Sequence, residues 1–193
     1  DEGKLAVVVH GLNNPRGLDF GPSGLLYVAE AGAGGTGPCF SGPEGGEACL
    51  GDTGSLTRVD LSRRVQERIV SGLPSIAARD GSQAIGPVDV SVFNDSQINI
   101  IIGMGGNPAD RPDPNLGQLM QGRAYWGFRS IADVAAYEGT ADPDGGEIDT
   151  NPYGLLALPD KQIVADAGGN DLLLVDSKGH ITTLAVFPDR LVL

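Results

Sequence analysis

The chain has 193 residues, a formal net charge of −12 and 40% hydrophobic residues, so it can bury a substantial core and is too hydrophobic to be intrinsically disordered. The excess of acidic residues argues against binding to nucleic acids or anionic membrane surfaces, which require a basic patch. The sequence contains no apolar run of membrane-spanning length, and we expect no membrane span.

Part of the sequence occurs twice. Residues 14–32 begin Asn-Pro-Arg-Gly-Leu and end Val-Ala-Glu-Ala-Gly, and residues 151–168 begin Asn-Pro-Tyr-Gly-Leu and end Val-Ala-Asp-Ala-Gly. A degenerate middle copy starts at residues 86–90 and continues to residues 100–103. Internal repetition of this kind indicates an array of similar supersecondary units. Because turn-forming residues are frequent and long helical periodicities are absent, we predict an all-β fold.

Each copy predicts short strands joined by tight turns. In the first copy, strands are expected at residues 18–20, 25–29, 55–61 and 65–70. In the last copy, they are expected at residues 153–158, 162–166, 172–176 and 180–187. Between the copies, residues 134–139 are expected to form either a helical turn, with Ser130 as its cap and Asp133 completing a capping box, or an outer strand.

Four short antiparallel strands that recur as a unit are typical of a β-propeller blade. We therefore predict a β-propeller of four-stranded antiparallel blades with three blades in one domain over residues 1–193. The expected blades are residues 12–74, with an insertion at 31–53, residues 85–140, with an insertion at 103–116, and residues 150–188.

Propellers close with about four to eight blades, because closure removes unpaired strand edges and buries the faces of the blades. Three blades would leave a hydrophobic face at each end. We therefore expect either that the chain is part of a longer propeller of six blades, or that two chains associate to complete such a ring.

The chain has two cysteines, Cys39 and Cys49, in a stretch rich in glycine and proline. Their even number and close spacing predict a local disulfide formed in an oxidising compartment, the alternative being two free thiols. The apolar stretch at residues 5–9 is too short for the core of a signal peptide and follows Asp1-Glu2, so we expect the chain to begin at a processed mature N-terminus. Together with the disulfide, this predicts an exported protein, either extracellular or periplasmic.

Several motifs carry a resemblance to a known family: Asn-Pro-Tyr-Gly-Leu at 151–155, Val-Ala-Asp-Ala-Gly-Gly-Asn-Asp-Leu at 164–172 and Leu-Ala-Val-Phe-Pro at 184–188. Together with residues 14–35 and 133–138, they resemble the ScyD/ScyE family. The resemblance implies an exported propeller related to NHL repeats, associated in some members with biosynthesis of the pigment scytonemin. Family chains are longer, which implies that this chain corresponds to about the N-terminal half.

Ligands of propellers usually bind at the mouth of the central channel, near the ends of the innermost strands. The aligned copies place Asn14, Gly86 and Asn151 at equivalent positions, followed by a second set with Arg16, Val88 and Tyr153. We expect a ligand-binding site at this mouth, formed by Asn14, Arg16, Asp89, Asn151 and Tyr153. Asn and Asp oxygens also suit a hard cation, and the alternative is that Asn-Pro only starts a turn.

Two acidic residues recur at one repeat position, Glu30 in the first copy and Asp166 in the last. Because a catalytic residue need occur only once, their repetition predicts a structural role, in which the carboxylate accepts hydrogen bonds from amides of the following turn.

Two further segments are candidate binding sites. Acidic residues alternate around a glycine bend at Asp142, Asp144, Glu147 and Asp149, which resembles a calcium-binding loop without the glutamate that such loops require at the twelfth position. We name calcium as the possible cofactor, with a solvated acidic turn as the alternative. The aromatic residues Tyr125, Trp126 and Phe128 are expected to pack beneath an insertion or to stack on a ligand.

We find no nucleophile motif such as Gly-x-Ser-x-Gly. The sequence thus favours a module of the ScyD/ScyE type that acts by binding or assembly, with a small molecule, polysaccharide or protein as partner. One alternative is a metal-assisted enzyme, like a lactonase or lyase, with Asn14, Asp89 and Asn151 as ligands. Another is a scaffold that binds a protein through the inserted loops.

Overall fold

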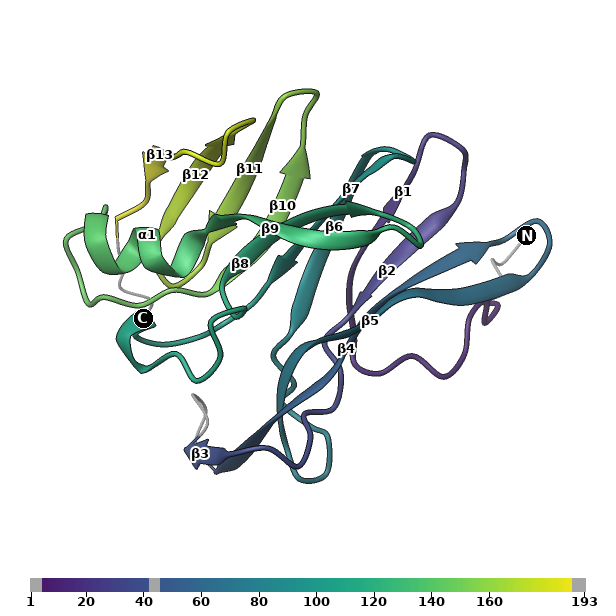
Figure 1. The fold of residues 1–193 in the computed structure, drawn as a ribbon, viewed down its shortest axis with the longest axis horizontal. Helices are drawn as coiled ribbons and strands as arrows, with labels where there is room; N and C mark the ends of the chain where they lie inside the picture. Colours follow the sequence, from purple (N-terminus) through teal and green to yellow (C-terminus); the bar gives the residue numbers. More distant parts are fainter. Residues whose placement is uncertain (1–4, 42–45, 189–193) are drawn as a thin grey trace.

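A computed structural model describes residues 5–41 and 46–188 and consists of three antiparallel sheets, which lie side by side (Figure 1). The all-β prediction is confirmed, as is the grouping of the strands into antiparallel sheets. The first sheet contains β1 (Pro15–Phe20), β2 (Leu26–Glu30), β4 (Glu47–Asp60) and β5 (Val65–Ala78), with the short β3 (Cys39–Ser41) added to β4.

The other two sheets are simple four-stranded meanders, in which each strand pairs with the next one along the chain. The second sheet contains β6 (Pro87–Asn94), β7 (Gln97–Ile102), β8 (Gln118–Arg123) and β9 (Gly127–Asp133). The third contains β10 (Pro152–Ala157), β11 (Lys161–Asp166), β12 (Asp171–Asp176) and β13 (Ile181–Val186). No helix of the described residues is long and apolar enough to cross a membrane.

The register of the sheets reproduces the alignment of the sequence copies. The proline that starts the first strand of each sheet lies opposite the last residue of the second strand: Pro15 opposite Glu30, Pro87 opposite Ile102 and Pro152 opposite Asp166. The register shifts immediately after each of these prolines. Each sheet therefore has an irregularity at the same place, which includes Arg16, Val88 and Tyr153 respectively.

The second sheet is buried on both faces. One core cluster joins Tyr27 and Leu56 of the first sheet to Ile98, Ile100 and other side chains of the second. Another joins Ile101 and Leu119 of the second sheet to Val164, Leu173 and Val175 of the third. Alternate side chains of a strand face opposite sides of its sheet, so the consecutive isoleucines at residues 100–102 of β7 contribute to both cores. Burial of each such side chain contributes roughly 1.5–3 kcal/mol.

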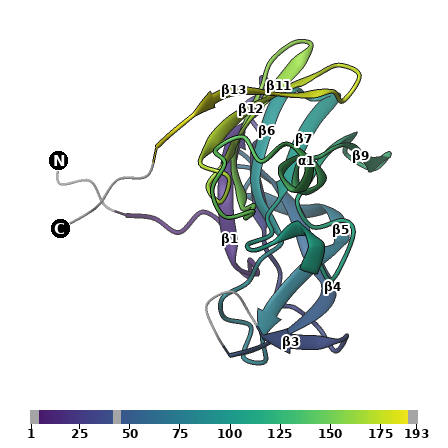
Figure 2. The ribbon, with the colours of Figure 1, turned by 90° about the vertical axis from the view of Figure 1, so that its left-hand side faces the viewer.

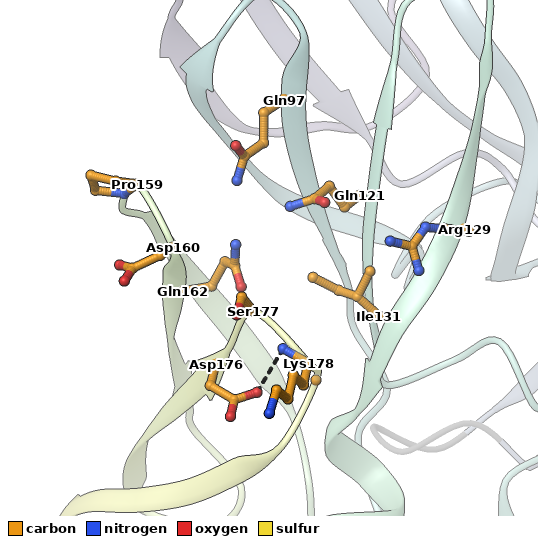
Figure 3. A pocket seen from close by; sticks show the side chains of 11 residues that line it. Gln97, Gln121, Arg129, Ile131, Pro159, Asp160, Gln162, Asp176, Ser177 and Lys178 are labelled. Carbon is orange, nitrogen blue, oxygen red and sulfur yellow. Dashed lines mark hydrogen bonds between the residues drawn. The ribbon is translucent and has the colours of Figure 1, made fainter.

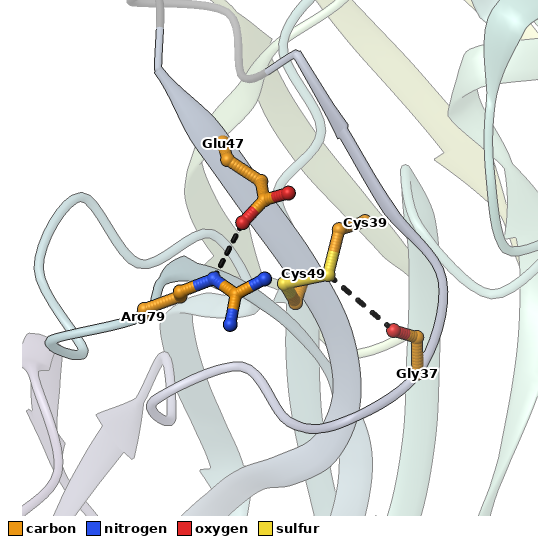
Figure 4. The surroundings of a disulfide bond; sticks show 5 residues. All are labelled: Gly37, Cys39, Glu47, Cys49 and Arg79. Carbon is orange, nitrogen blue, oxygen red and sulfur yellow. Dashed lines mark hydrogen bonds and ion pairs between the residues drawn. A yellow bond between two sulfur atoms is a disulfide. The ribbon is translucent and has the colours of Figure 1, made fainter.

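The first predicted insertion is partly strand. Residues 47–53 extend β4, and Ala48 and Cys49 pair with the far end of β5. Cys39 and Cys49 lie directly opposite each other on β3 and β4, with their Cα atoms 4.0 Å apart, and form the expected disulfide (Figure 4). Beside the disulfide, Arg79 forms an ion pair with Glu47. β3 and β13 lie at opposite ends of the molecule (Figure 2).

Of the two structures expected for residues 134–139, the helix is present and the outer strand is not. β9 continues to Asp133, and the helix α1 (Val134–Ala141) follows directly. The expectation that Ser130 caps this helix is wrong, because Ser130 pairs with Met120 within the sheet and its hydroxyl donates to Gln118. Asp133 is the cap, and its Oδ1 accepts the amide of Ala136 at 2.8 Å.

The second insertion contains the short 3₁₀ helix η1 (Pro108–Asp110), which contacts α1. The Arg111 guanidinium donates to both carboxylate oxygens of Asp133, at 2.8 and 3.1 Å. This inserted segment is thereby attached to the start of α1.

Candidate functional site

Arg16, Val88 and Tyr153 come from three different sheets and line one pocket of about 240 Å³. They belong to β1, β6 and β10, and β6 contacts both of the other strands. All three residues lie at the register shifts described above, and such irregularities redirect side chains away from the regular alternation of a strand. We call this recess the bulge pocket.

The bulge pocket combines an apolar wall with one positive charge. Ile76, Ile85 and Met104 line it together with Val88. Arg16 Nη2 donates to the carbonyl oxygen of Ala84 at 2.9 Å. None of the ion pairs in residues 5–41 and 46–188 includes Arg16. Tyr153 is 54% exposed, so its ring forms an accessible side of the pocket.

A second recess, of about 560 Å³, continues from the bulge pocket. The two recesses share Ile76, Ile85, Met104, Gly105 and Asn151. The walls of the second recess include Phe40 and Ser41 of the first predicted insertion and Asn107, Asp110 and Pro112 of the second. We call this second recess the insertion cleft, because both insertions line it.

The structure separates the residues that the sequence assigned to a channel mouth. Arg16, Asn151 and Tyr153 line the bulge pocket, whereas Asn14 and Asp89 do not. The Asn14 amide donates to the carbonyl oxygens of Gly32 and Gly81, at 2.7 and 2.8 Å.

Asp89 instead connects two sheets. Its carboxylate accepts the backbone amides of Val90 on its own strand and Leu155 on β10, both at 2.9 Å. Burial raises the pKa of Asp89, and these two amides only partly offset the effect. The role of Asp89 in the structure is thus to join β6 to β10.

Glu30 and Asp166 are both buried and accept amides near the start of their own copy. Glu30 accepts the amide of Asn13 at 2.6 Å and the Thr57 hydroxyl, and it forms an ion pair with Arg68 at 2.8 Å. Burial acts to raise the pKa of Glu30, but the hydrogen bonds from Arg68, Thr57 and Asn13 outweigh it and hold the pKa below its usual value.

Asp166 has a similar set of backbone partners but no basic partner among the described residues. Its Oδ1 accepts the amides of Asn151, Gly168 and Gly169, at 2.6, 3.0 and 3.2 Å, and its Oδ2 accepts the Thr150 hydroxyl. The carboxylates of Glu30 and Asp166 thus each connect the start of a sequence copy to the end of its second strand. The predicted hydrogen bonds from the following turn are present at Asp166 but not at Glu30, since the amides of residues 31–34 donate to other groups.

The acidic segment after α1 does not form a four-residue loop site. Asp142 and Asp144 lie with Glu138 of α1, and one carboxylate oxygen of each lies within 4.8 Å of the others. Glu147 is exposed, and Asp149 accepts the amide of Gly106 at 2.7 Å.

Glu138 and Asp171, which the sequence analysis did not single out, have strongly shifted pKa values. Burial, together with the charges of Asp166, Asp144 and Asp142, raises the pKa of Glu138 to about 7. Burial and the charges of Asp166, Glu138 and Asp144 likewise raise the pKa of Asp171 to about 7. The available sequence signal for the raised pKa of Glu138 was its spacing from Asp142, because like charges four residues apart on a helix lie close together.

A third recess, of about 250 Å³, lies between the second and third sheets (Figure 3). The amides of Gln97, Gln121 and Gln162 line it, with Lys178 and Asp176 at the β12–β13 turn. Gln162 is buried, and its Oε1 has no hydrogen-bond partner. These amides can form hydrogen bonds with neutral polar groups.

The aromatic cluster is not packed beneath an insertion. Tyr125 and Trp126 lie in the β8–β9 turn and are 64% and 80% exposed. The Arg123 guanidinium lies 5.4 Å from the Trp126 ring centre, and the Tyr125 hydroxyl accepts a hydrogen bond from Arg58 at 2.8 Å. Only Phe128 packs against the core. The expectation of packing fails for Tyr125 and Trp126 because their rings lie at the tip of a hairpin.

Comparison of the chain with models of protein families and with curated proteins found no match. Function is therefore inferred from the arrangement of residues in the recesses.

Proposed function

We propose that the chain is a ligand-binding β-propeller module, whose three sheets are blades, and that the bulge pocket binds a small aromatic molecule with an acidic group. The observation that supports this most strongly is the convergence of Arg16, Val88 and Tyr153 on one pocket. The three copies carry a different side chain at this equivalent position, as expected of residues selected for a ligand rather than for the repeat.

The chemistry of the pocket suits such a ligand. Small-molecule sites are mostly apolar, with few polar groups that fix the orientation of the ligand. A guanidinium binds carboxylates in a bidentate way and also stacks on aromatic rings. Arg16 supplies this group, Tyr153 supplies a ring, and Ile76, Ile85 and Met104 supply the apolar wall.

We further propose that the chain is an exported member of the ScyD/ScyE family with a role in binding or assembly, linked to biosynthesis of a scytonemin-type pigment. The repeated motifs support the family, and the Cys39–Cys49 disulfide supports an oxidising compartment. An aromatic ligand is consistent with a role in the metabolism of a pigment.

The geometry gives less support to a metal-assisted enzyme. That function would require Asn14, Asp89 and Asn151 to bind one cation together. The Asn14 amide is bound to two carbonyl oxygens, and the Asp89 carboxylate accepts two backbone amides. The scaffold alternative is also less favoured, since the inserted segments line a cleft that continues from the bulge pocket.

Binding of two matched probes, indole-3-acetate and its uncharged analogue indole-3-acetamide, tests the proposal by isothermal titration calorimetry. We expect the acid to bind more tightly. In the Arg16→Gln variant, the ratio of the two affinities should fall by about tenfold or more, since a hydrogen bond to a charged group contributes about 1.5–3 kcal/mol.

The matched control is Arg129→Gln, which removes an exposed arginine that lines other recesses but not the bulge pocket. This variant should retain the preference for the acid. Equal binding of acid and amide by the unmodified chain, or an unchanged preference in Arg16→Gln, would show that the bulge pocket is not the site.

A further inference from the structure

The first and third sheets differ in the partners of the acidic residue at one repeat position. In the first sheet, Glu30 lies opposite Ser55 on the neighbouring strand and forms an ion pair with Arg68. In the third sheet, Asp166 lies opposite Asp171. The third sheet thus has a second acid where the first has a neutral serine. Within residues 5–41 and 46–188, no arginine forms an ion pair with Asp166 as Arg68 does with Glu30.

The α1 helix brings more negative charge to the same place. Carboxylate oxygens of Glu138, Asp142 and Asp144 lie within 4.8 Å of one another. Asp171 lies close enough to Glu138 and Asp144 for their charges to act on it. We call Glu138, Asp142, Asp144 and Asp171 the carboxylate cluster.

Two members of the carboxylate cluster are buried, and four of its oxygens lack partners, whereas Asp144 accepts hydrogen bonds from Asn170 and Gly146 at 3.0 and 2.9 Å. Glu138 is 2% exposed and Asp171 is 3% exposed. Glu138 Oε1, Asp142 Oδ1 and both carboxylate oxygens of Asp171 have no hydrogen-bond partner. In the described part of the chain, no ion pair reaches any of the four residues. Burial of an unpaired carboxylate is costly, and buried charges are normally paired or coordinate a metal.

The position of the cluster at the end of α1 adds to the energetic cost of its unpaired negative charges. The C-terminal end of a helix carries a partial negative charge and favours cations. The last turn of α1 has no basic residue, and Asp142 ends the helix in a left-handed conformation, with φ 40°. A cation at this point would interact favourably both with the carboxylates and with the helix end.

From these contacts we propose that the carboxylate cluster is a calcium-binding site. Glu138, Asp142 and Asp144 provide the ligands, and Asp171 completes the site or balances its charge. Calcium takes six to eight oxygen ligands in flexible geometry, whereas magnesium requires a near-ideal octahedron. The bound ion would hold the end of α1 and the segment 142–149 against the β11–β12 turn.

This site differs from the loop suggested by the sequence. It keeps Asp142 and Asp144, but Glu138 and Asp171 replace Glu147 and Asp149. Gly169 leaves the room that the cluster requires, because a Cβ atom there would lie 2.9 Å from Glu138 Oε2. The site does not depend on the ligand proposed for the bulge pocket, so either proposal can fail without the other.

Calcium titration of the full chain, freed of metal with a chelator, tests the proposal by calorimetry and thermal unfolding. We expect saturable binding of one ion and a rise in the melting temperature. Glu138→Gln should lose both responses. In the presence of chelator the same variant should be at least as stable as the unmodified chain, because it removes repulsion, and this separates loss of a ligand from a failure to fold.

The matched control is Glu147→Gln, which removes an exposed acid of the same segment that is not part of the cluster. It should bind calcium as the unmodified chain does. Asp144→Asn provides a second ligand variant and should also lose the response. The proposal would be overturned by the absence of binding at millimolar calcium, or by a full response in both Glu138→Gln and Asp144→Asn.

Discussion

Gly17 of β1 lies directly against Asp89 of β6, so closely that a Cβ atom at Gly17 would overlap the carboxylate and lie 2.9 Å from Asp89 Cα. The same carboxylate accepts the Leu155 amide of β10. First strands of all three sheets therefore meet around Asp89, and the glycine allows the first two to approach each other.

We accordingly predict that Gly17→Ala lowers the free energy of unfolding by about 1–3 kcal/mol, the usual cost of overpacking a filled space. Urea unfolding followed by circular dichroism measures the change. Gly154→Ala is the matched control, because Gly154 is the equivalent residue of β10 and a Cβ atom there would meet only Ala165 Cβ, at 3.4 Å. A similar loss in both variants would mean that contact with Asp89 is not the cause.

The buried ion pair of Glu30 predicts a defined dependence on pH. Because the folded state holds the pKa of Glu30 below its usual value, the carboxylate stabilises the fold above the pKa of the unfolded chain. This contribution is lost as the pH falls through the folded-state pKa.

Glu30→Gln should therefore be less stable than the unmodified chain at pH 7, by about 1–3 kcal/mol, with the difference shrinking under acidic conditions. Unfolding free energies of both proteins between neutral and acidic pH measure this. A difference that stays constant with pH would show that Glu30 acts through packing and not through its charge.

Reduction of the Cys39–Cys49 disulfide should lower the stability by about 2–3 kcal/mol, the range expected for closing a short loop. Thermal unfolding with and without a reductant measures the effect, and the Cys39→Ser, Cys49→Ser double variant should melt as the reduced protein does and show no further change with reductant. Because the disulfide joins only β3 and β4, the bulge pocket should still bind its ligand in the double variant.

The third sheet predicts self-association. Leu156 of β10 and Leu184 of β13 are about half exposed and lie on the two edge strands of this sheet, and exposed edge strands are ready to pair with another chain. Light scattering coupled to size-exclusion chromatography should detect a species larger than one chain. Replacing both leucines with aspartate should shift it towards the monomer, whereas a stable monomer of the unmodified chain would contradict the prediction.

The strands of the third sheet could be predicted from the sequence almost to the residue, because short apolar runs lie there between clear turns. β4 could not, since the glycine-rich segment before Gly54 gives no alternation and its pairing depends on the distant β5. Arg16 and Tyr153 were identified because the copies differ at these positions.

The orientation of Asn14 and Asp89 was not predictable in the same way. The alternation of side chains does not hold across the register shift that follows each proline. The side of the sheet to which neighbouring side chains point therefore cannot be inferred from their spacing. Glu138 and Asp171 were missed for another reason. They are far apart in the sequence, and only the packing of α1 against the β11–β12 turn brings them together.

The double burial of β7 has a consequence for how the chain folds. The first and third sheets each bury an inner face against the second sheet, so neither can complete its core until β7 is in place. In arrays of this kind, stability is roughly the sum of unit and nearest-neighbour terms. The amides of Ile98, Ile100 and Ile102 should therefore exchange with solvent only through global unfolding, whereas those of β13 should exchange through local opening.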